Sequence, residues 1–218
     1  MVNGMGEMNA WSLLKAGGPI MYPIFLCSIF ALGIVLEKLY FFSIIQTDVA
    51  ALKRQIFDLV KNNKIKEAVQ ICDSHRSPVA KILKSGVIKF GASRNEIKES
   101  MEEASLFEIP KLESRMSALA TIAHISPLLG LLGTVTGMAT IFHTIQIRVG
   151  SLNPVTPGDL AGGIWEALLT TVAGLIVAIP SFVTYNYCVN RINHVVLEME
   201  RGATELLNFM CQLTETHT

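Results

Sequence analysis

The sequence predicts an all-α integral membrane protein with three transmembrane helices, and three observations support this fold class. Half of the 218 residues are hydrophobic, and the mean hydropathy of +0.44 is above the range of soluble domains. Three long segments contain few or no charged side chains. Because about 20 residues at ~1.5 Å each cross the ~30 Å hydrocarbon core, every one of these segments can span a bilayer. The lipid bilayer is therefore the first expected partner.

The first predicted span covers residues 20–45, in which Glu37 and Lys38 are the only charged residues. It starts late in the chain and lacks a small-x-small cleavage site, so we expect it to stay in the membrane rather than act as a cleaved signal peptide. We interpret Glu37 and Lys38 as an adjacent pair whose side chains reach the cytoplasmic headgroups, with a proton relay as the alternative.

The second and third spans are placed at residues 117–147 and 163–190. The second contains no Asp, Glu, Lys or Arg, and the third contains only Glu166. Four further parts complete the predicted organisation: an N-terminal periplasmic segment (1–19), a cytoplasmic helical region (46–116), a periplasmic connection (148–162) and a cytoplasmic C-terminal helix (191–218).

Basic residues set the predicted orientation. Thirteen of the eighteen lysines and arginines lie between residues 46 and 115, whereas the stretch from 148 to 165 has only Arg148. The positive-inside rule therefore places the long region and the C-terminus in the cytoplasm and the N-terminus in the periplasm. Asn153-Pro154 and Thr156-Pro157-Gly158 predict a compact turn in the outer connection.

The cytoplasmic region has the pattern of amphipathic helices. Apolar spacing predicts helices at 49–60 and 64–75, and Ser93 with Glu96 forms a capping box that starts a third. No glycine follows before the second span, so we expect one long helix that leaves the membrane, with the C-terminal stripe of 191–213 packed beside it. Prolines inside predicted helices are expected to kink them: Pro110, Pro127 and Pro180.

Small residues line one face of each of the last two spans. On the second span these are Gly130, Gly133 and Gly137, with Thr134 beside them; on the third they are Ala167, Thr171, Gly174 and Ala178, with Glu166 and Thr170 at the edge. In lipid, such faces permit close approach of helices, so packing alone is one interpretation. The other is that the faces line an ion path.

Two groups favour the ion path. Hydroxyls of Thr134 and Thr171 can orient water, and a carboxylate such as Glu166 is costly at a membrane helix and tends to face a cavity, although an outer interfacial position is the alternative. At ~100° per residue, His143 points away from Thr134 and His124 lies ~80° off, so neither is assigned a role. No Asp or Glu lies in the central part of any span. If protons cross here, another chain must supply the carboxylate.

Other function classes find little support. The four cysteines are scattered without a CxxC pair or Cys/His cluster, so no disulfide framework or metal site is predicted. Charges balance at 18 basic and 18 acidic residues, which gives no reason to expect nucleic acid. There is no nucleophile with its base and no phosphate loop, so we expect neither an enzyme nor a cofactor.

Two long motifs then identify a resemblance. Residues 127–138 (PLLGLLGTVTGM) and 163–175 (GIWEALLTTVAGL), followed by Ala178-Ile179-Pro180 and Tyr185-Asn186, closely resemble the MotA/TolQ/ExbB proton-channel family. The resemblance extends to residues 15–19 (KAGGP), to Glu37-Lys38 where the family usually has Glu-Arg, and to residues 109–113 (IPKLE). Three spans are similar to the ExbB/TolQ branch. His124 departs from the small residue usual in the family.

The resemblance implies a ring, a pentamer, in the bacterial inner membrane around single-span ExbD/TolR-like subunits whose transmembrane aspartate carries the proton. It implies pore-lining roles for Thr134, Thr171 and Glu166, with Thr170 adjacent. Proton motive force would then drive movement of the partner and export work to TonB-like or TolA-like machinery. The alternative is a non-conducting membrane scaffold. The sequence leaves open the driven process, the exact stoichiometry, the partner genes and whether Na⁺ replaces H⁺.

Overall fold

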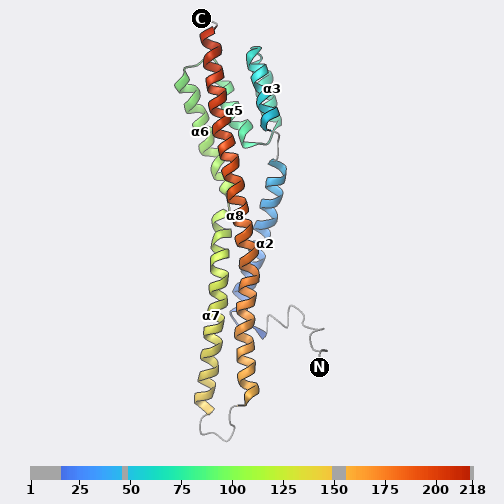
Figure 1. The fold of residues 1–218 in the computed structure, drawn as a ribbon, viewed down its shortest axis with the longest axis vertical. Helices are drawn as coiled ribbons and strands as arrows, with labels where there is room; N and C mark the ends of the chain where they lie inside the picture. The colour runs from blue at the N-terminus through green and yellow to red at the C-terminus, as the bar shows by residue number, and fades with distance from the viewer. Residues whose placement is uncertain (1–15, 46–48, 149–155, 217–218) are drawn as a thin grey trace. The chain divides into compact units, whose positions relative to one another are not determined.

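The computed structural model describes residues 16–45, 49–148 and 156–216. In these ranges every regular element is an α-helix, and three stretches are long and apolar enough to cross a membrane: Met21–Ile45, a window within Arg94–Arg148 and a window within Pro157–Leu213 (Figure 1). The predicted all-α fold and the three candidate spans are confirmed. The chain divides into two compact units, Met1–Leu36 with Arg115–Asn186 (unit 1) and Glu37–Ser114 with Tyr187–Thr218 (unit 2).

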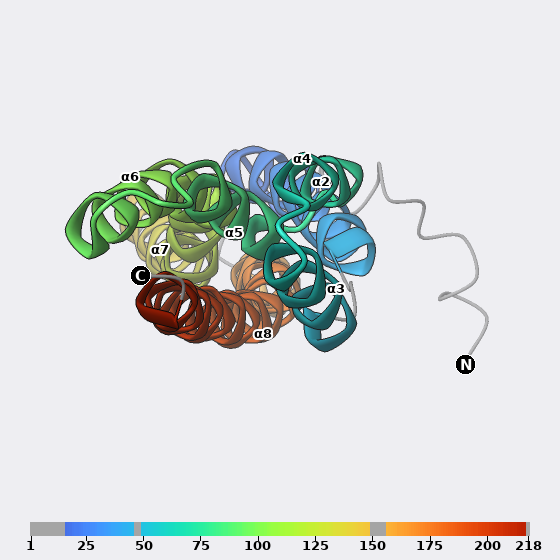
Figure 2. The same ribbon diagram turned by 90° about the horizontal axis from the view of Figure 1, so that it is seen from above.

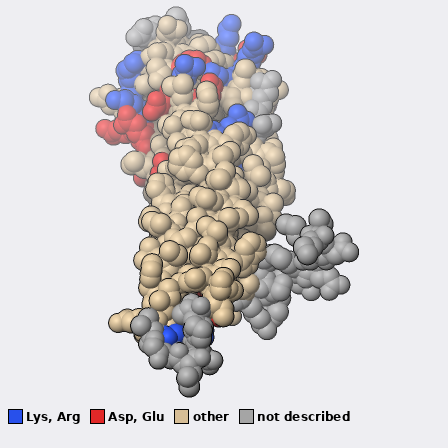
Figure 3. Space-filling view, turned by 60° about the horizontal axis from the view of Figure 1, so that its bottom comes forward, with Lys and Arg blue, Asp and Glu red and all other residues tan. Residues whose placement is uncertain are grey.

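Unit 1 contains most of α2 (Met21–Ile45), all of α7 (Met116–Arg148) and the N-terminal half of α8 (Pro157–Thr216). Its described residues include only four charged side chains: Arg115, Arg148, Asp159 and Glu166. Figure 3 shows that much of the surface in view carries no Lys, Arg, Asp or Glu. Large apolar side chains such as Leu128, Val135 and Ile176 are exposed in the single chain, as expected for surfaces covered by lipid or by other subunits.

The start of α8 differs from the predicted turn. Thr156 and Asp159 cap the helix reciprocally: the Thr156 hydroxyl accepts from the Asp159 N–H at 3.3 Å, and the Asp159 carboxylate accepts from the Thr156 N–H at 3.0 Å. Pro157 occupies the first helical position, where its missing N–H costs nothing. The prediction of a turn at residues 156–158 is therefore wrong for Pro157 and Gly158, while Asn153-Pro154 lies outside the described residues.

Unit 2 is a bundle of short helices packed on the C-terminal half of α8. It contains α3 (Val49–Lys61), α4 (Ile65–Ser74), α5 (Pro78–Ile88) and α6 (Arg94–Glu113). The helices predicted at 49–60 and 64–75 are confirmed within one residue at each end, and so is the Ser93–Glu96 capping box, with the Ser93 N–H donating to Glu96 at 2.9 Å. Viewed along the long axis, α5 lies between α4 and α6, and it contacts both (Figure 2).

Helix α5 was not predicted from the sequence, although its signal is present. Pro78 stands at its first turn, and apolar residues follow at helical spacing and are buried: Val79, Ile82, Leu83 and Val87. Gly86 on this helix meets two partners at once, because a Cβ there would lie 2.8 Å from Met101 Sδ and 3.3 Å from Leu206 Cδ2. The helix thus forms the centre of unit 2.

The predicted packing of the C-terminal tail is confirmed. Met199, Leu206 and Met210 of the expected stripe are buried, and Phe209 stacks on Phe57 of α3 with ring centroids 5.1 Å apart. Toward α6, the Arg94 guanidinium donates to Asn208 Oδ1 at 3.0 Å. The tail therefore joins α3, α5 and α6 into one core.

The expected single helix from residue 94 into the second span is wrong. Helix α6 continues past Pro110 but ends at Glu113, and α7 begins at Met116. Between them Ser114 has ψ of 133°, outside the helical range, and Arg115 has φ of 63°, a left-handed conformation that a helix cannot contain. Sequence patterns missed the break because the left-handed residue is an arginine and not a glycine.

Lys38 does not extend toward headgroups as predicted. Its side chain is 3 % exposed, and its ammonium donates to the Leu112 carbonyl at 3.0 Å while lying 5.5 Å from the Phe41 ring centroid. Leu112 is in the last turn of α6, where carbonyls have no partner within the helix and a cation is favourable. Lys38 thereby caps α6 next to the break.

We expect Lys38→Met to destabilise the chain by about 1–3 kcal/mol, since it keeps an apolar stem but leaves the buried Leu112 carbonyl without a donor. The measurement is thermal unfolding of the purified protein in detergent. Lys66→Met, at an exposed position of α4, is the matched control and should melt as the wild type does. Equal melting temperatures for the two variants would contradict the capping role.

Candidate functional site

The candidate site lies where α7 and the N-terminal half of α8 meet in unit 1. A Cβ added at Gly130 would lie 2.9 Å from the Thr171 Cα, and one at Gly174 would lie 2.5 Å from the Ser126 carbonyl oxygen. Real Cβ atoms do not come this close to backbone atoms, so only glycine permits this separation. Gly137 similarly faces Ala167, whose Cβ would be 2.9 Å away. The two predicted small-residue faces therefore pack on each other within one chain.

The threonines of α8 behave differently from one another. The Thr171 hydroxyl crosses the interface and donates to the Gly130 carbonyl at 3.0 Å. Thr170 is 1 % exposed, packs against Gly133 and donates to the Ala167 carbonyl of its own helix at 2.7 Å. Thr171 is thus the hydroxyl that joins the two helices.

Thr134 is not brought into this contact. Its side chain is partly exposed, and its hydroxyl donates to the Leu131 carbonyl of its own helix at 2.7 Å. It lies at the edge of the glycine face, where a lipid or another subunit beside the helix pair can contact it. Ala178, the last residue of the small face on α8, is buried.

A pocket of about 130 Å³ opens at the connection end of the same helix pair. Its lining is contributed by four residues of each helix: Gly137, Thr140, Ile141 and Thr144 of α7, and Asp159, Leu160, Gly163 and Glu166 of α8. Gly163 permits the close approach here, because a Cβ would meet Ile141 Cγ1 at 2.5 Å. Two carboxylates and two hydroxyls thus converge on one small space.

Glu166 faces this pocket and is half-buried, so it is not a fully exposed interfacial residue. Its carboxylate lies against the turn that precedes α2, where Gly18 has φ of +67° and where a Cβ would collide with Glu166 Oε1. Two features therefore require glycine at position 18: its left-handed backbone conformation and the space that the Glu166 side chain occupies.

Asp159 supplies the second carboxylate at the pocket mouth. Hydrogen bonds from the Thr156 N–H and hydroxyl, with the Arg148 guanidinium at 2.9 Å, lower the pKa of Asp159 below its ordinary value. It consequently carries a negative charge at neutral pH.

Sequence reasoning missed three polar residues of the pocket: Thr140, Thr144 and Asp159. For the two threonines the signal was the continuation of the polar row on α7, since Thr136, Thr140 and Thr144 follow at intervals of four and share one face. The hydroxyls of Thr140 and Thr144 each donate to the carbonyl four residues earlier at 2.9 Å.

The remaining residues considered in the sequence, two prolines and a histidine, lie within α7 and α8. Pro127 and Pro180 lie inside α7 and α8, where each removes one backbone hydrogen bond. His124 is exposed, with Nδ1 2.8 Å from the Ala120 carbonyl of its own helix, and its ring is edge-on to Phe182 at 6.1 Å.

Comparison with known proteins gives consistent matches. The profile of the MotA/TolQ/ExbB proton channel family matches residues 74–201. The protein named ExbB-like 3 of Synechocystis sp. is 32 % identical over 78 % of this chain and 80 % of its own length. The biopolymer transport protein ExbB of Neisseria meningitidis is 30 % identical over 83 % of this chain and 87 % of its own length. The ExbB homolog of Methanothermobacter thermautotrophicus is 28 % identical over 86 % of this chain and 66 % of its own length.

Proposed function

Because the chain belongs to the MotA/TolQ/ExbB proton channel family, in its ExbB branch, we propose that it is the proton-conducting subunit of an inner-membrane complex that couples proton motive force to biopolymer transport. The observation that carries the proposal is the α7–α8 pair. It has a hydroxyl-bearing, close-packed interface at mid-span and a pocket with Glu166 and Asp159 at one end.

The proposed mechanism needs a second subunit. The central parts of the three candidate spans contain no carboxylate, and a threonine hydroxyl cannot release a proton near neutral pH. A single-span, ExbD/TolR-like partner with a transmembrane aspartate would supply the titrating group. Protons would enter from the periplasmic side through the Glu166 pocket and pass to that aspartate beside Thr134 and Thr171.

Protonation decides where the partner's carboxyl group rests. An ionised carboxylate is costly in an apolar pore, whereas the neutral acid is tolerated, so each proton transfer changes which part of the pore wall the partner prefers. Several copies of this chain, a pentamer by resemblance, would form the ring, and their exposed apolar surfaces would face each other and the lipid. The partner would pass the resulting movement to a TonB-like or TolA-like protein.

The orientation belongs to the same proposal. With the basic region of residues 46–115 in the cytoplasm, unit 2 and the C-terminus are cytoplasmic and the Glu166 pocket faces the periplasm. In that orientation the two carboxylates at the pocket attract cations from the outer side. Sodium in place of protons is the ionic alternative.

The test is proton flux in reconstituted vesicles. The chain is reconstituted with the single-span protein encoded beside its gene, and flux is followed with an internal pH dye under an imposed potential. We expect flux with the partner, and none when the partner's transmembrane aspartate is changed to asparagine. A sodium gradient in place of the proton gradient separates the two ions.

A non-conducting scaffold is the second candidate function, and one packing observation favours it. The glycine face of α7 is occupied by α8 of the same chain, so these glycines serve helix packing whether or not ions pass. Assembly with the partner but no flux at any potential would support the scaffold and overturn the conducting role.

A further inference from the structure

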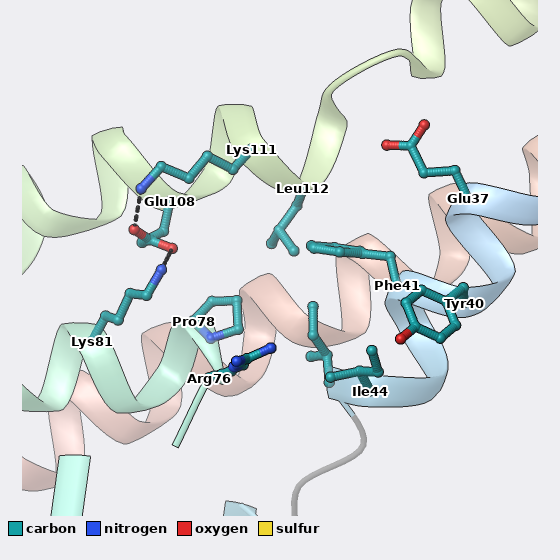
Figure 4. Close-up of a pocket in the computed structure, with 11 residues that line it drawn as sticks. Glu37, Tyr40, Phe41, Ile44, Arg76, Pro78, Lys81, Glu108, Lys111 and Leu112 are labelled. Carbon is teal, nitrogen blue, oxygen red and sulfur yellow. Dashed lines mark hydrogen bonds and ion pairs between the residues drawn. The ribbon is translucent and has the colours of Figure 1, made fainter. Parts of the chain in front are cut away.

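A second pocket, of about 280 Å³, lies within unit 2 at the C-terminal end of α2 (Figure 4). Three parts of the unit contribute to its wall: the last two turns of α2, the segment that joins α4 to α5 with the first turn of α5, and the end of α6. Its volume is close to the lower limit of about 300 Å³ that is usual for small-molecule sites. Neither the α7–α8 pair nor the Glu166 pocket shares residues with it.

One side of this pocket is apolar and aromatic. Tyr40, Phe41 and Ile44 come from the end of a helix that is long and apolar enough to cross a membrane, and Tyr40 is 70 % exposed. Tyrosine at the end of a span is typical of the headgroup level of a bilayer. A pocket beside such a tyrosine suits the level at which a lipid's acyl chains meet its headgroup.

The other side is cationic. Glu108 is largely buried and binds two lysines: Lys81 Nζ is 2.8 Å from Oε2, and Lys111 Nζ is 2.6 Å from Oε1. Burial alone would raise the pKa of Glu108, but the hydrogen bonds from Lys111 and Lys81 outweigh it and lower the pKa below its ordinary value. Glu108 is thus ionised and holds two ammonium groups at the pocket wall. Each ammonium has three N–H donors, so donors remain for a ligand.

Arg76 adds a third cation. Figure 4 shows its guanidinium between Pro78 and Ile44, on the pocket side of the chain. Lys81 and Lys111 share the charge of Glu108, whereas Arg76 forms no ion pair with any residue that the structure describes. A guanidinium presents a rigid fork of donors that suits a phosphate group.

We propose that this pocket binds the headgroup of an anionic phospholipid, with the phosphate on Arg76, Lys81 and Lys111 and the glycerol and upper acyl chains along Tyr40, Phe41 and Ile44. The charge balance of the lining favours an anion, because three cations face two carboxylates, Glu37 and Glu108. The apolar half and its place at the end of a span favour a lipid over a soluble phosphate. The bound lipid would link α5 and α6 to the C-terminal end of α2.

The test is lipid binding to the full-length protein in zwitterionic detergent, measured by native mass spectrometry. Phosphatidylglycerol, phosphatidylcholine and inorganic phosphate are titrated separately. We expect phosphatidylglycerol to bind at least about tenfold tighter than phosphatidylcholine, because phosphatidylcholine carries the same phosphate together with a choline cation that the three basic side chains repel, and one charge contact is worth about this factor. Equal affinity for the two lipids, or saturation of the site by inorganic phosphate at the same concentration, would overturn the proposal.

Two matched variants locate the site. Arg76→Gln should reduce the affinity for phosphatidylglycerol about tenfold, because it removes the guanidinium and keeps much of the side chain. Arg201→Gln makes the same change at an exposed position of α8, where the arginine pairs with Glu198 at 3.7 Å, and should bind as the wild type does. If both variants kept full affinity, or both lost it equally, the lipid would not be held in this pocket. The result does not depend on proton flux, so it stands apart from the proposed function.

Discussion

Gly174→Ala is expected to unfold at a markedly lower temperature than the wild type, with a loss of about 3 kcal/mol or more. A Cβ at this position would lie 2.5 Å from the Ser126 carbonyl oxygen and 3.2 Å from the Gly130 Cα, so the atoms nearest to it all belong to the backbone of α7. Overpacking against side chains typically costs about 1–3 kcal/mol, and backbone has less freedom to move away. The helices α7 and α8 must therefore separate. Thermal unfolding in detergent and the yield of assembled complex are the two measurements.

Gly162→Ala is the matched control for this variant. Gly162 lies on the same helix, and a Cβ there would have nothing within 4 Å. Because alanine favours helix over glycine by about 1 kcal/mol, the control should be unchanged or slightly stabilised. If Gly174→Ala behaved like Gly162→Ala, the close approach of α7 and α8 would not exist in the membrane.

Thr171→Val should reduce partner-dependent proton flux more than tenfold. Valine keeps the shape of threonine but removes the hydroxyl that donates to the Gly130 carbonyl at 3.0 Å. Losing this hydrogen bond between the two helices costs about 0.5–1.5 kcal/mol, and the proposed path also loses the hydroxyl that joins the two helices. Flux per reconstituted protein, measured as for the wild type, is the readout.

Two further variants separate a structural effect from a role in the path. Thr171→Ser keeps the donor and should retain most of the flux. Thr121→Val changes an exposed threonine of α7 that bonds only the Ser117 carbonyl of its own helix, and it should conduct as the wild type does. Wild-type flux for Thr171→Val, with or without a lower melting temperature, would remove Thr171 from the proposed path.

The sequence determined the features that depend on neighbours along the chain. The spans follow from runs without charge, the start of α6 follows from Ser93 and Glu96, and the packing side of the C-terminal tail follows from the spacing of Met199, Leu206 and Met210. These are local properties, because hydropathy, capping and helical periodicity involve residues within a few turns of each other. Helix α5 carried a comparable local signal that was overlooked.

Only the tertiary structure decided which of these faces meet. Lys38 looked like a residue that reaches the headgroups, yet 74 positions later along the chain Leu112 presents a carbonyl that needs a donor. The glycine face of α7 packs against α8 and accepts a hydrogen bond from Thr171. Asp159 and Glu166 of α8 line one pocket together with threonines of α7. Such contacts depend on how helices distant in sequence lie side by side, and no local pattern contains that information.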